Sequence, residues 1–180
     1  MHQQLYEFLS ANELLTPNQF GFPPPKLSTV TALAHFTDNI LQSLDKGGFT
    51  GAVFFDLSKA FDTVDHVLLA EKLKTIGASS QVVKWFASYL ESQYQVTSVE
   101  SCQSTQQKVP VGVPQGSILV PLLFLIYVND PPNCLEHRQV VMYADDTLTY
   151  LSANCCQNIE YHLNADRLAS LAEWFNNNYD

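Results

Sequence analysis

The chain has 180 residues, of which 46% are hydrophobic and 12% are aromatic. This length fits one domain or a large part of one, and the apolar content is too high for a wholly disordered chain. The formal net charge of −9 argues against a nucleic-acid partner, because proteins that grip a phosphate backbone are usually basic.

No targeting or membrane signal is visible in the sequence. Met1 is not followed by a basic region and an apolar stretch, as in a secretory signal. The longest apolar run, residues 118–128, is too short to cross a bilayer and contains Pro121. The four cysteines lack metal-finger spacing and are expected to be reduced thiols. We therefore expect an intracellular protein without a membrane partner; neither its compartment, nucleus or cytoplasm, nor its oligomeric state follows from the sequence.

The chain begins with a helical pattern. Residues 2–15 carry apolar side chains at helical spacing, and Pro17 interrupts that pattern. We therefore expect an N-terminal helical segment over residues 1–17 and a main domain over residues 18–180.

The main domain begins with a proline-rich loop at residues 21–26, a helix and a strand. Ser28 is placed to cap the helix, and Gly47 is placed to stop it. A continuous apolar strand over residues 51–57 follows, which is typical of a buried central strand, and Asp56 lies near its end. The residues expected on the buried face of the helix are Val30, Leu33, Thr37, Ile40, Leu41 and Leu44.

The rest of the chain adds helices and two hairpins. The expected elements are a helix over 63–76, a helix capped by Ser79 or Ser80, a hairpin of 95–99 with 107–111, a turn at 112–117, an apolar helix over 118–128, a hairpin over 140–151 and a helix over 156–175. This order does not alternate strand and helix, so it indicates an α+β fold.

Asp145 and Asp146 are adjacent acids between two β-prone runs. Both can face one site only if the backbone turns, which predicts a hairpin with Ala144, Asp145 and Asp146 at its tip. Neighbouring carboxylates raise each other's pKa unless a cation lies between them, and Mg²⁺ suits such oxygen ligands. The alternative is an ordinary solvated turn, since Asp is a common turn residue.

Asp56 is a second acidic position that packing explains poorly, because the strand before it is suited to burial. The alternative role for Asp56 is as a helix N-cap. Together with Asp145 and Asp146, it would complete the smallest carboxylate set for a two-metal site. Phosphoryl transfer is the reaction class that uses such a site.

Three segments carry a family resemblance. Residues 55–66 (FDLSKAFDTVDH), 112–119 (GVPQGSIL) and 143–146 (YADD) occur in the order and spacing of successive reverse transcriptase motifs. The resemblance is closest to non-LTR (LINE-type, jockey-like) retrotransposons and extends from about Asn18 to the C-terminus. It implies a right-hand polymerase of which this chain holds fingers and palm, with an antiparallel palm sheet packed on helices and the thumb missing beyond an incomplete C-terminus.

The resemblance also implies RNA-directed DNA polymerase chemistry on an RNA template, a DNA primer and dNTPs. Asp56, Asp145 and Asp146 would be the catalytic, metal-binding acids for Mg²⁺, with Mn²⁺ as a possible substitute. Phe61 would exclude a 2′-hydroxyl from the incoming nucleotide. The other residues implied to contact substrate are Leu57, Gly112, Pro114, Gln115, Gly116, Tyr143, Ala144 and Lys26.

The chain departs from the family pattern mainly in its basic residues. Prolines occupy positions 23–25, where arginine and glycine are usual, which leaves Lys26 to meet a triphosphate. The alternative function is therefore a truncated, catalytically inactive remnant of a retroelement, or a binding module that is not an enzyme.

Overall fold

The computed structural model describes residues 1–22, 28–134, 138–164 and 169–179. Residues 23–27, which include Lys26 and most of the predicted proline-rich loop, lie outside the described residues. The helices are α1 (His2–Ala11), α2 (Thr29–Asp45), α3 (His66–Thr75), α4 (Ser80–Glu91), α5 (Val120–Tyr127), α6 (Cys156–Leu163) and α7 (Ala169–Tyr179), with a 3₁₀ turn η1 (Pro131–Cys134). The strands are β1 (Phe49–Phe55), β2 (Tyr94–Gln95), β3 (Ser98–Val99), β4 (Cys102–Gln103), β5 (Gln107–Lys108), β6 (Gln139–Tyr143) and β7 (Asp146–Ala153).

The main sheet is antiparallel, and its described strands follow the order β1-β7-β6. The strand that is paired on both sides is β7, and its residues Thr147 to Tyr150 are buried. The prediction that β1 is a buried central strand is wrong, because β1 lies at an edge and Phe54 is 73% exposed. An apolar run alone does not distinguish a strand buried on both faces from an edge strand.

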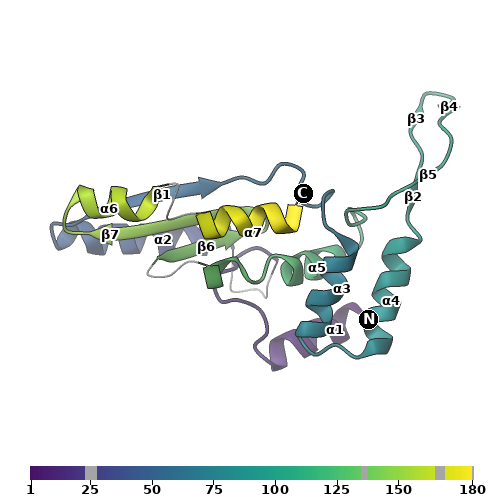
Figure 1. The fold of residues 1–180 in the computed structure, drawn as a ribbon, viewed down its shortest axis with the longest axis horizontal. Coiled ribbons are helices and arrows are strands. Elements are labelled where there is room, and N and C mark those ends of the chain that lie inside the picture. Colours follow the sequence, from purple (N-terminus) through teal and green to yellow (C-terminus); the bar gives the residue numbers. More distant parts are fainter. Residues whose placement is uncertain (23–27, 135–137, 165–168, 180) are drawn as a thin grey trace.

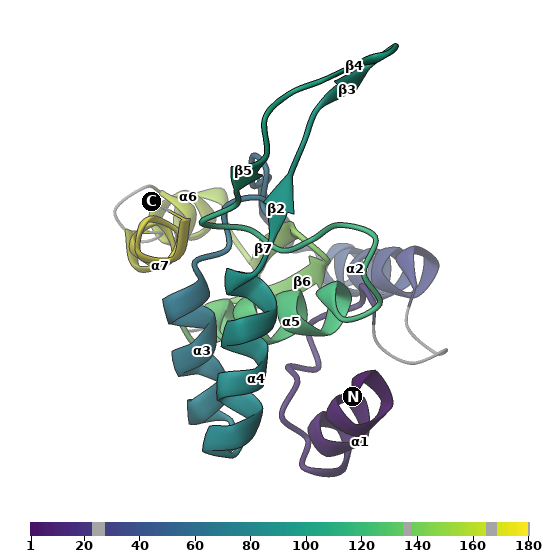
Figure 2. The same ribbon diagram turned by 90° about the vertical axis from the view of Figure 1, so that its right-hand side faces the viewer.

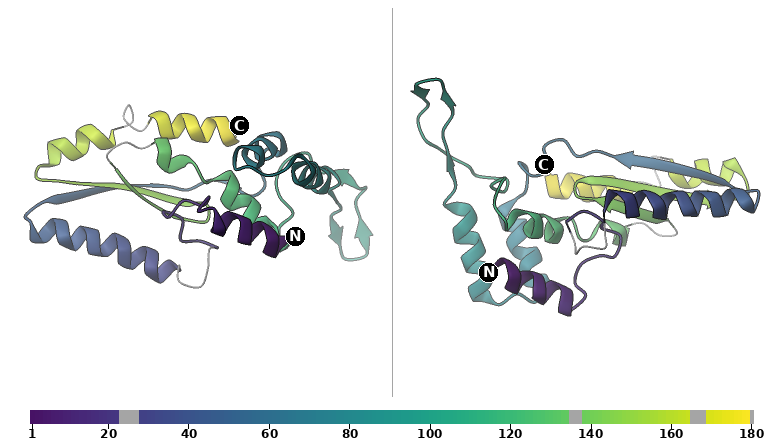
Figure 3. Two further views of the ribbon diagram at one scale, coloured as in Figure 1. Left: turned by 90° about the horizontal axis from the view of Figure 1, so that it is seen from below. Right: turned by 180° about the vertical axis from the view of Figure 1, so that it is seen from behind.

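Helices cover both faces of this sheet. Figure 3 shows α2 along one face and α6 and α7 along the other. On the face of α6, an added Cβ at Gly51 would lie 2.2 Å from Ile159, so glycine lets the helix approach the strand closely. Val53, Val140 and Met142 on this face belong to the main core around α5.

The main core joins the sheet to a bundle of α1, α3, α4 and α5 (Figure 2). Helix α5 is apolar on all sides, and all of its residues except Pro121 are buried, as its composition requires. The predicted stop for α3 is confirmed by Gly77, whose φ of 89° favours glycine. The other core side chains of this bundle include Leu5, Leu9, Leu69, Leu73, Phe86 and Leu90.

The predicted helix caps are confirmed. The Ser28 hydroxyl accepts a hydrogen bond from the Thr31 backbone N–H at 3.2 Å, and Thr31 Oγ1 accepts from the Ser28 N–H at 2.7 Å, which forms a capping box. Of the two candidates for α4, the cap is Ser79, whose hydroxyl accepts from Val82 N–H at 3.4 Å. Asp65 caps α3 through Leu68 N–H at 2.7 Å.

The predicted buried face of α2 is wrong. Val30, Leu33, Leu41 and Leu44 are exposed, while Ala32 is buried and Phe36 packs against Val141, Leu148 and Tyr150. Apolar residues lie on two sides of α2, so periodicity alone leaves the buried side open. The contact with the sheet selects the stripe that begins at the small residue Ala32.

Two elements differ in detail from the sequence predictions. The predicted hairpin is present as an arm that projects from the body, with β2 paired to β5 and β3 paired to β4 (Figures 1 and 2). The single helix predicted over residues 156–175 is wrong, because α6 ends at Leu163 and Asn164 has an extended ψ of 162°. Within the described residues, no helix is long and apolar enough to cross a membrane.

Candidate active site

The hairpin of β6 and β7 places two of the predicted acids. Tyr143 pairs with Asp146, so Ala144 and Asp145 form the turn and Asp146 begins β7. Ala144 has a φ of 54°, a left-handed conformation that costs a residue with a Cβ about 1–2 kcal/mol. Such a turn keeps its shape only if the surrounding structure holds it.

Gln19 supplies that support, and sequence reasoning missed it. The buried Gln19 side chain accepts a hydrogen bond from the Ala144 N–H at 2.9 Å and donates one to the Ala144 carbonyl oxygen at 3.1 Å. Gly21 lies so close to the turn that an added Cβ would be 2.4 Å from the Ala144 nitrogen. The polar amide of Gln19 gives no helical or strand signal, so only the tertiary structure identifies its partner.

The segment that carries Gln19 runs alongside β6. Met142 N–H donates to the Asn18 carbonyl oxygen at 2.8 Å, and Phe20 N–H donates to the Met142 carbonyl oxygen at 2.8 Å. This parallel bridge fixes the position of Gln19 relative to the turn. The predicted acidic hairpin is therefore held by residues more than a hundred positions earlier.

Asp56 directly follows β1 at the same end of the sheet. Phe55 pairs with Thr147, so the next residue along β1 comes opposite Asp146. Its alternative role as a helix N-cap is wrong, because the helix that follows, α3, is capped by Asp65. The three acids thus lie near the same end of the sheet, with Asp56 just after β1, Asp145 in the turn and Asp146 at the start of β7.

The electrostatics of Asp146 reflect this arrangement. Partial burial raises the pKa of the Asp146 carboxyl, and the negative charges of Asp145 and Asp56 raise it further. Among the described residues, no three His, Cys, Asp or Glu side chains are grouped tightly enough to hold a metal ion. The three carboxylates thus interact electrostatically, although they do not form a metal-binding cluster within the described residues. Their oxygens and mutual repulsion suit a divalent cation.

Gly112 lies against the loop that follows β1. An added Cβ there would lie 2.6 Å from the Asp62 carbonyl oxygen, and φ is 87°. Its N–H donates to the Val64 carbonyl oxygen at 2.8 Å, and its own carbonyl oxygen is 2.7 Å from His66 Nε2. The close approach that glycine permits here is to another part of the backbone, and it joins the 112–117 turn to residues 61–66.

Gln115 lines two separate cavities beside this turn. Its side-chain amide donates to Asp62 Oδ1 at 2.8 Å. A cavity of about 280 Å³ is lined by Phe61, Gln115 and Gly116 together with Phe22 and Ile118. A larger one of about 690 Å³ is lined by residues that include Gly112, Pro114, Gln115, Lys59 and Lys108.

The ring of Phe61 is fixed by other aromatic rings. It stacks on Phe124 with centroids 4.1 Å apart and meets Phe22 edge-on at 6.4 Å. Leu57 is half-buried against the main core. Tyr143 lies elsewhere, in a cavity with Asp56 and Asp146. The predicted substrate residues are therefore distributed over separate cavities.

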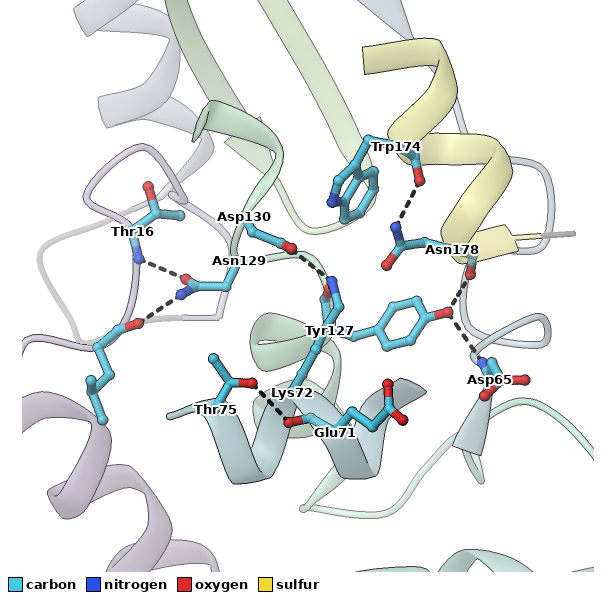
Figure 4. Close-up of polar contacts among 11 residues, drawn as sticks. Thr16, Asp65, Glu71, Lys72, Thr75, Tyr127, Asn129, Asp130, Trp174 and Asn178 are labelled. Atoms are coloured by element: carbon cyan, nitrogen blue, oxygen red, sulfur yellow. Dashed lines mark hydrogen bonds and ion pairs between the residues drawn. The ribbon is translucent and has the colours of Figure 1, made fainter. Parts of the chain in front are cut away.

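A partly buried polar cluster lies between α3, α5 and α7 (Figure 4). Lys72 Nζ donates to the Tyr127 carbonyl oxygen at 2.6 Å and to Asp130 Oδ1 at 2.7 Å, and it lies 4.8 Å from the ring of Trp174. The Tyr127 hydroxyl accepts from the Asp65 N–H and donates to the Asn178 carbonyl oxygen. Burial raises the pKa of Tyr127. These contacts tie α3, α5 and α7 together, and sequence reasoning missed them.

Known proteins resemble this chain along almost its whole length. Residues 1–177 match the family described as "Reverse transcriptase (RNA-dependent DNA polymerase)". A probable RNA-directed DNA polymerase from transposon BS of Drosophila melanogaster is 33% identical over 180 residues, covering 95% of this chain and 19% of the relative. The RNA-directed DNA polymerase from mobile element jockey of Drosophila funebris is 30% identical over 167 residues, covering 84% of this chain and 18% of the relative. The chain thus spans about a fifth of the length of these curated relatives.

Solved structures support the polymerase fold. Telomerase from Candida tropicalis, in complex with a fragment of telomeric RNA, has a TM-score of 0.64 at 14% identity and covers 94% of this chain and 31% of its own. An apo telomerase from the same organism has a TM-score of 0.62 at 16% identity, and the match covers 97% of this chain and 35% of the telomerase chain. The resemblance to jockey-like, non-LTR elements is confirmed by the relatives. The chain belongs to the reverse transcriptase family.

Proposed function

We propose that this chain carries the catalytic centre for nucleotidyl transfer to a primer 3′-hydroxyl. The observation that supports this most directly is that Asp56, Asp145 and Asp146 lie near one end of the sheet, where partial burial and then the charges of Asp145 and Asp56 raise the pKa of Asp146. Unneutralised carboxylates in such proximity are unfavourable unless cations bind between them.

Asp56, Asp145 and Asp146 would hold the divalent ions, Mg²⁺ or in its place Mn²⁺. Bound there, the ions would neutralise charge on the transferred phosphate and favour the ionised 3′-hydroxyl. The protein's own contribution is to hold its acids in position, and Gln19 does this for the turn through both polar groups of Ala144.

The proposed substrates are an RNA template, a DNA primer and dNTPs. Phe61 would act as the steric gate, because its ring is fixed by Phe124 and cannot easily move aside for a 2′-hydroxyl. Gln115 and Gly116 share a cavity with Phe61 and would contact the incoming nucleotide. Leu57, Gly112, Pro114, Tyr143, Ala144 and Lys26 complete the proposed contact set.

The second candidate is a folded binding module without polymerase activity. One observation favours it: the net charge of −9, which weakens the hold of the chain on a phosphate backbone. Both hypotheses accept the same fold, so they differ only in what the acids do.

Primer extension on an RNA template separates the two. The chain is assayed with Mg²⁺ and with Mn²⁺ beside Asp145→Asn, and Asp45→Asn serves as a charge-matched control on the exposed end of α2. The polymerase proposal predicts incorporation by the wild type and Asp45→Asn that falls at least about a hundredfold in Asp145→Asn. Binding of the template without incorporation, or incorporation that is equal in Asp145→Asn, contradicts it.

A further inference from the structure

Helix α2 has a second apolar stripe that faces away from the sheet. The helix packs on β1, β6 and β7 through the side that carries Ala32 and Phe36. On its outer side, no other described helix or strand lies against it (Figure 3). The large apolar side chains that α2 leaves more than half exposed are Val30 (73%), Leu33 (65%), Leu41 (52%) and Leu44 (56%). A contiguous exposed patch of this kind is typical of an interaction surface.

These four side chains are arranged symmetrically about Thr37, which is also exposed. Leu33 and Leu41 lie four positions before and after it, and Val30 and Leu44 lie seven positions before and after it. Such spacings keep all five side chains on one face of the helix, which we call the outer stripe. A stripe whose apolar positions match in both directions can pair with itself, because a twofold interface requires that residue i meets residue j and j meets i.

We propose that the outer stripe of α2 is a dimerisation surface, on which α2 of a second copy packs antiparallel with Thr37 at the centre. In this arrangement Leu33 faces Leu41 of the second copy, and Val30 faces Leu44 of the second copy. Thr37 meets its own counterpart, and its short side chain lets the two helices approach closely where they cross. This inference goes beyond the proposed function and does not depend on it.

The charges of α2 suit this orientation. The outer stripe itself contains no charged side chain. Asp45, eight positions after Thr37, comes opposite Thr29 of the second copy, in the first turn of that helix, where the helix dipole favours an acid. Asp38 lies beside the centre of the stripe and each copy has a net charge of −9, so the copies also repel each other at longer range. Salt screens this repulsion and should therefore strengthen the dimer.

The extent of this surface indicates a reversible dimer. A single pair of helices of this length is expected to bury less than the roughly 1,200 Å² at which standard stable interfaces begin. The apolar surface continues past the helix, because Leu33 also lines a cavity of about 440 Å³ with Phe36 and with Phe54 of β1, which is itself exposed. We therefore expect association that is visible at high protein concentration and is lost on dilution.

Sedimentation equilibrium of the whole chain tests the proposal. The wild type should form a dimer that strengthens with salt. Leu33→Lys and Leu41→Glu should each weaken it at least about tenfold, because each places a charge against an apolar side chain. Val67→Lys, which changes an exposed apolar residue of α3, is the matched control and should associate as the wild type does. Far-UV circular dichroism checks that each variant is folded.

A mixture of the two charged variants tests the pairing itself. Equimolar Leu33→Lys and Leu41→Glu should recover most of the association, because the two introduced charges face each other across a mixed dimer and the other copies of these positions remain apolar. A parallel arrangement would bring each position against its own counterpart, so the mixture would recover nothing.

Cysteine cross-linking gives the orientation a second readout. Thr37→Cys should form a disulfide-linked dimer, because the two copies of this position meet at the centre. Leu33→Cys should not, since its two copies would lie roughly 12 Å apart along the helix axis, beyond the reach of a disulfide. The wild type measures the background from native cysteines such as the exposed Cys102.

Three results would overturn the inference. One is a wild type that stays monomeric at every concentration. Another is association that Leu33→Lys leaves unchanged, which would assign the contact to a different surface. The third is a mixture of the charged variants that associates no better than its separate components, or cross-linking of Leu33→Cys without cross-linking of Thr37→Cys, since either excludes antiparallel pairing about Thr37.

Discussion

The two faces of the central sheet are built from the same strands and have opposite characters. Toward α5 and α6, Val53, Val140 and Met142 belong to one continuous core. Toward α2, the buried cluster is small, Phe54 is exposed, and the face ends at Asp56 and Asp146. Because side chains alternate along a strand, one set of residues supplies stability while the next set remains available for chemistry.

A pair of substitutions, one on each face, tests whether the two faces contribute differently to stability. Met142→Ala should lower the free energy of unfolding by about 2–5 kcal/mol, because Met142 is 1% exposed within the main core. Phe54→Ala should lower it by less than about 1.5 kcal/mol, since it loses only an edge-on aromatic contact at the surface. Urea denaturation of both variants measures the difference. Equal losses would show that the α2 face contributes as much stability as the core.

A second substitution tests whether the acidic turn at the end of the sheet depends on support from elsewhere in the chain. Gln19→Ala should lower the free energy of unfolding by about 1–3 kcal/mol, because it leaves the buried N–H and carbonyl groups of Ala144 without their partner. Gln3→Ala, which removes an exposed amide from α1, is the matched control. A loss in Gln19→Ala no greater than in the control would mean that the turn holds its own shape.

The smallest expected effect is a pH dependence that comes from the acids. With its pKa raised above the ordinary 3.8, Asp146 keeps its proton to higher pH in the folded than in the unfolded chain. The folded state therefore binds more protons between 3.8 and the raised pKa, so stability falls as pH rises through that window. Asp146→Asn should flatten this fall in urea titrations at acid pH, and Asp45→Asn should not. A fall that is steeper in Asp146→Asn than in the wild type would contradict a raised pKa of Asp146 in the folded chain.

Local signals predicted the parts of the fold whose partners are near in sequence. Ser28 and Ser79 cap helices through N–H groups three residues later, so their role is visible without a tertiary structure. The acidic hairpin was predictable for the same reason, since its two strands are joined by a turn of Ala144 and Asp145.

Features that depend on distant partners were not predictable in this way. The buried side of α2 is chosen by Val141 and Leu148, and the edge position of β1 follows from its pairing with β7. Gln19 is 125 residues away from Ala144. The motif resemblance located the acids and the 112–117 turn, but it could not show that Gly112 packs on the Asp62 backbone.

The central proposal is that Asp56, Asp145 and Asp146 form a divalent-cation centre at one end of the sheet. Thermal unfolding with and without millimolar Mg²⁺ tests it most directly, on the wild type, Asp56→Asn and the charge-matched Asp45→Asn. A cation that binds the folded chain raises its melting temperature. We predict a rise with Mg²⁺ in the wild type and Asp45→Asn that disappears in Asp56→Asn. The same rise in all three proteins, or none in the wild type, would contradict the claim.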